Sequence, residues 1–165
     1  MRILGLDPGL NTTGYGVVEG PAATKGLILL EAGVVRSVKD DPMPLKIKAI
    51  YDGVREVIEQ YRPHTVALES LYSHYDRPTT AIMMGHARGA ICLAAAQSGI
   101  EVFPYAATKV KKMLTGSGHA SKDQMQRAIM LELALKKYPE PADVADALAI
   151  ALCHYHHRNS EALFQ

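Results

Sequence analysis

Short apolar runs that end on an acidic residue stand out along the chain. The first run, Ile3 to Leu6, is followed by Asp7 and then by the turn signal Pro8-Gly9. Pro8 lacks a backbone donor and fixes φ, so we predict that the strand stops at Asp7. A second run, Thr65 to Leu68, ends in the same way on Glu69. We therefore expect two buried strands that each deliver a carboxylate to the rim of a sheet, although Asp7 alone also suits a residue that merely opens a turn.

The remaining elements follow from the same periodicities. Apolar runs bounded by turn residues predict further strands; these are Gly14–Glu19, Leu27–Val35 and Glu101–Tyr105. The first strand and the next two predict a three-stranded antiparallel meander. Apolar residues at helical spacing, together with capping and proline signals, predict helices; these are Leu45–Tyr61, Pro78 to about Ser98, Ala106–Leu114, Ser121 to about Tyr138, and a last helix from Pro141. Strands mixed with helices predict an α/β fold.

Size and composition favour one globular domain. The chain has 165 residues, of which 48% are hydrophobic, and this suffices for a sizeable core. We expect a single domain over 1–158 and a frayed tail over 159–165. The run from Ala81 to Ile100 is interrupted by polar residues, which favours a buried helix over a membrane span.

Two further features point to a reducing compartment. Only Cys92 and Cys153 occur, without CxxC spacing, so no disulfide framework is expected. Met1 leads directly into a strand, so we expect no secretory signal. A cytoplasmic protein is the resulting prediction.

The formal net charge is only +1, so any contact with nucleic acid needs a local basic patch. Such a segment lies between Tyr105 and Arg127. It holds five basic residues against the single acid Asp123; the basic residues are Lys109, Lys111, Lys112, Lys122 and Arg127. The segment suits a phosphate-facing patch, and a solvated helix face explains it equally well.

The last helix opens with two acids in apolar surroundings. Asp143 and Asp146 are three residues apart and so share one face near the helix N-terminus. The helix dipole favours acids there, which is a purely structural explanation. However, two carboxylates among alanine, valine and leucine residues repel each other and lose hydration, so they need a cation nearby.

Together these observations predict a metal site formed by four acids: Asp7, Glu69, Asp143 and Asp146. Hard divalent cations such as Mg²⁺ take oxygen ligands. Two such ions about 4 Å apart can activate a water and stabilise the leaving oxygen of a phosphodiester. A basic segment nearby can then hold the flanking backbone.

A zinc site is a weaker alternative at the other end of this helix. Cys153, His154, His156 and His157 are close in sequence, but on one helical segment their side chains point around the axis, which does not suit a tetrahedral site. We expect a solvated helix end there. Gly85 and Gly89, one turn apart, leave two options open: packing of their helix on its own sheet, or a subunit interface.

Several of these stretches together resemble the RuvC family of crossover junction endodeoxyribonucleases. The stretches are DPGLNTTGYGVV, ALES with Tyr72 just after it, GHARGA, YAATKVKKMLTGSGHASKDQM and ADVADALAIALCH, and they span nearly the whole chain in order. The resemblance implies a ribonuclease H-like fold, a five-stranded mixed sheet flanked by helices. It also implies a homodimer that resolves Holliday junctions by metal-dependent nicking of two opposing strands, in recombination and DNA repair. Coupling to a RuvA–RuvB branch-migration complex is implied as well.

The resemblance also assigns roles to residues. The four acids match the family's metal-binding catalytic residues, with two Mg²⁺, or Mn²⁺, expected per site. Lys122 is expected near the scissile phosphate and Lys111 on the DNA backbone, with Lys109, Lys112 and Arg77 as further DNA contacts. Tyr72 stands where relatives often have phenylalanine, and its ring keeps a face for stacking on a base. Gly85, Arg88 and Gly89 are expected at the dimer interface. Asp143 departs from relatives that carry histidine, so the metal preference can differ.

Three other functions compete with junction resolution. An actin-like nucleotide-binding protein also starts with an acid and glycine after its first strand, but it usually needs two such lobes. A silent DNA-binding module on the same fold would not need the four acids. Another nuclease of the same fold, acting on a different nucleic acid, is separated from a junction resolvase only by substrate comparison.

Overall fold

The computed structural model describes residues 1–20, 26–71 and 78–162. Five strands form one mixed sheet in the order β3-β2-β1-β4-β5. The strands are β1 (Arg2–Asp7), β2 (Thr12–Glu19), β3 (Ile28–Arg36), β4 (Thr65–Glu69) and β5 (Glu101–Tyr105). The first three form the predicted antiparallel meander, while β4 runs parallel to both β1 and β5. All five predicted strands are confirmed.

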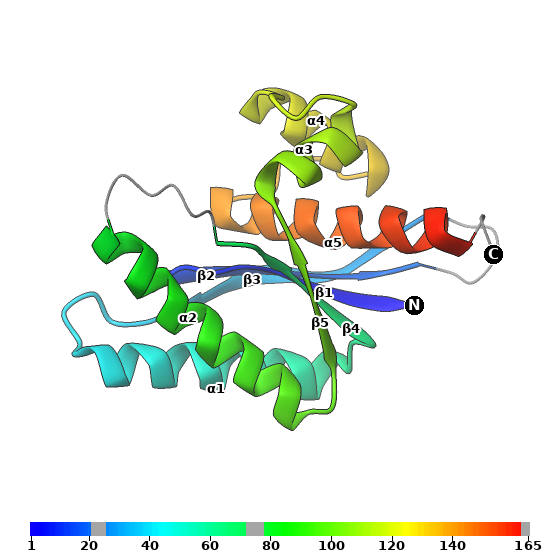
Figure 1. The fold of residues 1–165 in the computed structure, drawn as a ribbon. Helices are drawn as coiled ribbons and strands as arrows, with labels where there is room; N and C mark the ends of the chain where they lie inside the picture. Colours follow the sequence, from blue (N-terminus) through cyan, green and yellow to red (C-terminus); the bar gives the residue numbers. More distant parts are fainter. Residues whose placement is uncertain (21–25, 72–77, 163–165) are drawn as a thin grey trace.

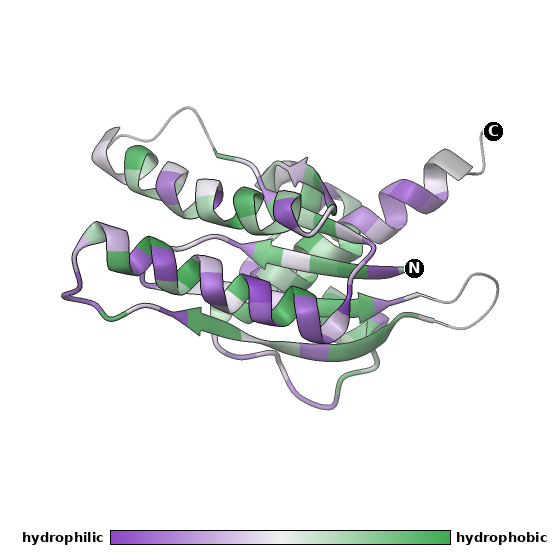
Figure 2. Cartoon of the chain, turned by 90° about the horizontal axis from the view of Figure 1, so that it is seen from below, coloured by the Kyte–Doolittle hydropathy of each residue, from purple (hydrophilic) through white to green (hydrophobic). Residues whose placement is uncertain are grey.

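Helices cover both faces of the sheet (Figure 1). The helices are α1 (Met43–Tyr61), α2 (Pro78–Gln97), α3 (Ala107–Thr115), α4 (Lys122–Glu132) and α5 (Ala142–Ala162). α1 and α2 lie on one face, and α5 lies on the other, with α3 and α4 outside it. Figure 2, which views the face covered by α1 and α2, shows hydrophilic residues along the outer side of α1. This is the polar face expected of an amphipathic surface helix.

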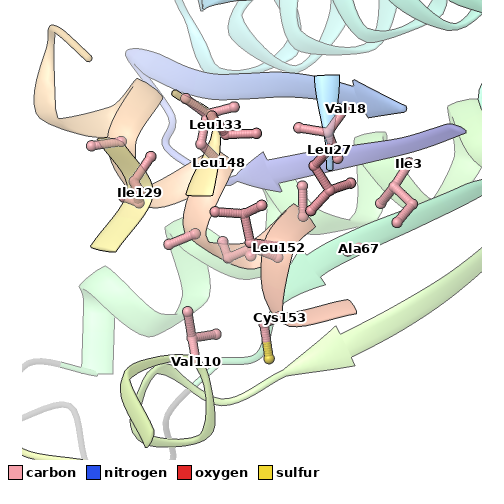
Figure 3. Packing of buried hydrophobic residues seen from close by; sticks show 14 of the residues in the cluster. Ile3, Val18, Leu27, Ala67, Val110, Ile129, Leu133, Leu148, Leu152 and Cys153 are labelled. Atoms are coloured by element: carbon pink, nitrogen blue, oxygen red, sulfur yellow. The ribbon is translucent and has the colours of Figure 1, made fainter. Parts of the chain in front are cut away.

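The alternation of side chains along the strands divides the core in two. Leu4 and Leu6 of β1 pack with α1 and α2, whereas Ile3 packs with α5. In β4, likewise, Leu68 faces α1 and α2 while Ala67 faces α5. Figure 3 shows the part of the core on the α5 side of the sheet, where side chains from α3, α4 and the sheet surround α5. α5 is therefore buried on most of its circumference, which explains why its sequence is apolar almost all round.

One helix boundary was predicted wrongly. α4 has the expected N-cap, since Ser121 accepts from the backbone of Gln124 in a capping box. It ends at Glu132, however, and not near Tyr138. Ala134 adopts φ of 50°, and the amide of Leu135 donates to the carbonyl of Met130, as in a Schellman ending. Buried Leu133 anchors this turn in the core.

The last helix runs further than the sequence pattern indicates. α5 continues to Ala162, so the first part of the predicted tail, from Asn159 on, is helical. Over the described residues, no helix combines the length and apolar character needed to cross a membrane.

Candidate active site

Two strands present carboxylates on the same face of the sheet. Side chains alternate along a strand, so Asp7 follows Ile3 on the face towards α5, and Glu69 follows Ala67 in the same way. Leu6 pairs with Leu68 in the parallel ladder, directly before the two acids. β1 and β4 therefore bring Asp7 and Glu69 side by side at the end of neighbouring strands.

Glycines let α5 approach this face closely. A β-carbon on Gly5 would lie 2.1 Å from the carbonyl oxygen of Ala147, and one on Gly14 would lie 2.0 Å from that of Asp143. Gly14 is also the residue that pairs with Asp7 across β1 and β2. Only glycine leaves room for the backbone of α5 at these positions. The N-terminal turns of α5, with Asp143 and Asp146, are thus held against the strand that carries Asp7.

The charges of the four acids act on one another, which identifies them as one cluster. Burial raises the pKa of Asp7 to about 8, and the negative charges of Glu69, Asp146 and Asp143 contribute to the rise. A protonated Asp7 also donates a hydrogen bond to Glu69. Such a rise is typical of carboxylates that share one site and cannot all ionise together.

Basic residues moderate this repulsion. Burial and the charge of Asp146 raise the pKa of Glu69, while its hydrogen bond with Asp7 and the charges of Arg88 and Lys111 lower it. Burial raises the pKa of Asp146 too, against the nearby charges of Lys122 and Lys111. Taken over the whole residue, Asp146 is nonetheless more exposed than the other three acids, so solvent screens its interactions most.

Two clefts connect the acids to the basic segment. One, of about 60 Å³, is lined by Glu69, Lys111 and Asp146 together with apolar residues of α3, α4 and α5. The other, of about 230 Å³, is lined by Lys111, Lys122 and Asp146 above Met125 and Ile129. The structure thus brings six of the predicted residues together at this site: Asp7, Glu69, Asp143, Asp146, Lys111 and Lys122.

The other predicted DNA-contacting residues lie further out or outside the described chain. Lys109 and Lys112 are exposed on α3, and the ammonium of Lys109 lies 5.1 Å from the ring centre of Tyr105. Tyr72 and Arg77 lie outside the described residues. Their predicted roles stay predictions.

The predicted interface residues lie on α2. Gly85 and Gly89 line an apolar groove of about 510 Å³, which also includes Ile82 and Leu93. Ile82 is 62% exposed and Leu93 is 52% exposed. Arg88 is not part of the lining, and its charge acts on Glu69 instead.

The histidine-rich end of α5 differs from the expected solvated helix end. His154 is fully buried, and its Nδ1 lies 2.8 Å from the hydroxyl of Tyr105. His156 pairs with Glu132 on α4, and this hydrogen bond raises the pKa of the imidazole. The prediction failed for His154 because the folded chain covers this end of α5, where the rings of Phe103 and Tyr105 on β5 pack against the imidazole. Tyr105 pairs with Glu69 in the sheet, so the Tyr105–His154 contact ties α5 to the strand ends near the acids.

The acids suit a hard divalent cation in their chemistry. The donor set is oxygen-only, as Mg²⁺ or Mn²⁺ prefers, and a cation would offset the repulsion that raises the pKa of Asp7. Within the described part of the chain, no three Asp, Glu, His or Cys side chains converge on one point that could hold an ion. The fit to a cation therefore lies in the chemistry of the donor oxygens, and the described side chains do not enclose an ion site as they lie.

Sequence reasoning missed two features of the site. The first is the set of strand glycines that admits α5; a glycine within a strand is itself a sign of close backbone approach. The second is the charge of Arg88 beside Glu69, for which the local sequence gives no signal, since α2 and β4 meet only in the folded chain.

Comparisons with known proteins agree with this arrangement. The model of the family described as Crossover junction endodeoxyribonuclease RuvC matches residues 3–154. A relative from Rhodopirellula baltica with the same description is 55% identical over 156 residues, which cover 93% of this chain and 85% of the relative.

Solved structures match over almost the full length. The structure of Thermus thermophilus RuvC has a TM-score of 0.88 at 37% identity and covers 98% of this chain and 97% of that one. T. thermophilus RuvC in complex with Holliday junction substrate has a TM-score of 0.91 at 36% identity, covering 98% and 96% respectively. The five-stranded mixed sheet with its helices is thus the ribonuclease H-like fold of these proteins.

Proposed function

Because the chain belongs to the RuvC family of crossover junction endodeoxyribonucleases, we propose that it resolves Holliday junctions in recombination and DNA repair. It nicks two opposing strands of the four-way junction symmetrically, in a reaction that depends on a divalent metal ion. The observation that carries this proposal is the cluster of four acids, with two lysines beside it, at the C-terminal ends of β1 and β4. A protein that only bound a polyanion would gain nothing from concentrating negative charge there.

The residues that hold the metal are Asp7, Glu69, Asp143 and Asp146, with two Mg²⁺ per site and Mn²⁺ as a substitute. When bound, the ions supply activation of water and neutralisation of charge on the phosphate and on the leaving 3′ oxygen. The strand ends and α5 supply rigid support for these ligands, which a catalytic geometry requires. The proton on Asp7 must leave before its carboxylate can act as a ligand.

The lysines serve the phosphate rather than the metal. Lys122 lies near Asp146 and lines the larger cleft, so its ammonium can neutralise charge that develops on the scissile phosphate. Lys111 lines both clefts and holds the neighbouring backbone. Lys109, Lys112 and Arg77 add phosphate contacts, and Tyr72 stacks on a base at the opened crossover.

Symmetric cutting needs two active sites, which a homodimer supplies. The exposed apolar groove with Gly85 and Gly89 on α2 supports a second copy as its occupant, since two glycines one turn apart let another helix approach closely. The family also implies delivery to junctions by a RuvA–RuvB branch-migration complex in the cytoplasm.

The test is cleavage of a synthetic four-way junction in Mg²⁺, in Mn²⁺ and in chelator. We expect paired nicks with either metal and none in chelator. Asp7→Asn and Asp146→Asn should abolish cleavage while junction binding persists. Normal cutting by either variant would contradict the proposal.

Substrate comparison separates the competing functions. Equal cutting of plain duplex or of an RNA–DNA hybrid would favour another nuclease of this fold. Junction binding without metal-dependent nicking would favour a silent DNA-binding module. Hydrolysis of ATP without a junction would favour a nucleotide-binding protein.

A further inference from the structure

Arg88 carries a buried donor that is not used within the described part of the chain. Its Nη1 is buried and has no hydrogen-bond acceptor among the described residues. Buried donors of charged groups almost always have a partner in native proteins. An arginine nitrogen without one points to an acceptor that comes into reach in another state of the site.

The position of Arg88 on α2 explains where its guanidinium lies. Ala87 and Ile91 are fully buried against the sheet, and Arg88 follows Ala87 by one helical step of 100°. It therefore borders the core-facing side of α2 and not the side that lines the exposed groove. From this position on α2, a long side chain can extend towards the C-terminal end of β4.

Glu69 is the acid whose pKa the charge of Arg88 lowers. The chain leaving β4 passes close to α2, since Leu71 Cδ1 lies 4.0 Å from the position of a β-carbon on Gly85, one turn before Arg88. The positive charge of Arg88 lowers the pKa of Glu69, and does so more than the charge of Lys111. Glu69 accepts a hydrogen bond from Asp7, and Nη1 of Arg88 has no acceptor among the described residues, Glu69 included.

We propose that Arg88 is a positioning residue for Glu69, and that its buried Nη1 donates to the Glu69 carboxylate when a divalent cation binds among the acids. This inference rests on the proposed metal-dependent site. Carboxylates that ligate metals commonly accept a hydrogen bond from a neighbouring residue that does not touch the metal. Loss of such a partner weakens metal binding by about 10–100-fold. An arginine suits this role because its charge is permanent and its donors are rigidly arranged.

The test is Mn²⁺ affinity, measured by isothermal titration calorimetry on the full chain without DNA. Arg88→Gln should weaken binding by about tenfold or more. Arg88→Lys keeps the charge without the planar donors, so its affinity should fall between those of Arg88→Gln and the wild type. Arg55→Gln removes one positive charge from an exposed ion pair with Glu59 on α1 and should bind Mn²⁺ as the wild type does.

Further measurements separate this role from a structural or interface role. Unfolding in chelator reports whether each variant folds, and sedimentation reports its oligomeric state. If folded Arg88→Gln protein binds Mn²⁺ with the affinity of the wild type, the proposal is overturned. This holds also when the variant changes only in its dimerisation. If Arg88→Gln does not fold, Arg88→Lys decides, because weakened binding supports the proposal and unchanged binding overturns it. Failure of the wild type to bind Mn²⁺ would instead overturn the proposed function.

Discussion

The carbonyl oxygen of Asp143 occupies the space that a side chain on Gly14 would need, at 2.0 Å from the position of its β-carbon. Gly14 pairs with Asp7 in the sheet, so this contact also sets how close Asp143 comes to Asp7. The distance between two predicted metal ligands thus depends on a residue that has no side chain.

Gly14→Ala should therefore damage both the fold and the site. Overpacking of this kind costs about 1–3 kcal/mol of stability, and a shift of α5 by about 1 Å can lower cleavage by about 100-fold. Urea unfolding and junction cleavage measure the two effects. Gly26→Ala is the matched control, because no atom of the described residues lies within 4 Å of its β-carbon position. If the two variants have the same stability and the same cleavage rate, α5 tolerates displacement from β2.

Asp7→Asn should alter how stability depends on pH in chelator. Because burial raises the pKa of Asp7 from 3.8 to about 8, the folded state binds a proton more tightly than the unfolded state. The stabilisation from that proton is present at low pH and is lost as the pH rises from about 4 to 8. Burial raises the pKa of Glu69 and Asp146 as well, and these shifts act in the same direction.

The wild type should thus lose thermal stability over this pH range more steeply than Asp7→Asn, and the variant should melt higher at pH 8. Differential scanning calorimetry at pH 5 to 8.5 measures the difference. Added Mg²⁺ should raise the melting temperature of the wild type at pH 8, because binding to the folded state stabilises it. Parallel pH profiles of the two proteins would contradict the raised pKa.

Lys122→Ala should slow cleavage more than it weakens binding. Removal of one group that stabilises developing charge costs about 100-fold in rate, whereas loss of one phosphate contact weakens binding only modestly. Single-turnover cleavage and a gel-shift titration separate the two effects, and Lys122→Arg should recover part of the rate. Lys48→Ala serves as the control, because Lys48 forms an exposed ion pair with Asp52 on α1. If weaker junction binding explains the whole loss of cleavage, Lys122 contacts only the DNA backbone and does not act on the scissile phosphate.

Leu93→Glu should weaken self-association. Leu93 is half exposed in the groove on α2, and burial of a carboxylate there against a second copy is unfavourable. Analytical ultracentrifugation should show a shift towards monomer, with loss of paired nicking. Leu131→Glu makes the same change at an exposed leucine of α4 that lies outside the groove. Dissociation by Leu131→Glu but not by Leu93→Glu would move the interface to α4.

Much of the fold was predictable because local signals agree with the tertiary structure. Pro8 limits β1 as predicted, and the acids after two apolar runs do end β1 and β4. The end of α4 was not predictable, because the left-handed residue there is Ala134, where glycine or asparagine is the usual signal. That His154 is buried depends on the cover that α3 and the sheet give to α5, which helical periodicity alone does not reveal.

The candidate site was predictable only as a set of residue types. Asp7 and Glu69 could be expected at strand ends, but their shared face with Asp143 and Asp146 depends on the parallel pairing of β1 with β4. The role of Arg88 was missed for the same reason, since its position relative to Glu69 depends on how α2 packs against the sheet.

The helix that carries Asp143 and Asp146 is also the most deeply buried helix of the molecule, with every residue from Ala147 to His154 inside. Amide protons there cannot exchange with solvent by fraying of a surface element; they require opening of the whole domain. The backbone that directly follows the two acids in α5 is therefore lost only in global unfolding, and mutations that weaken the core should reduce nuclease activity and thermal resistance together.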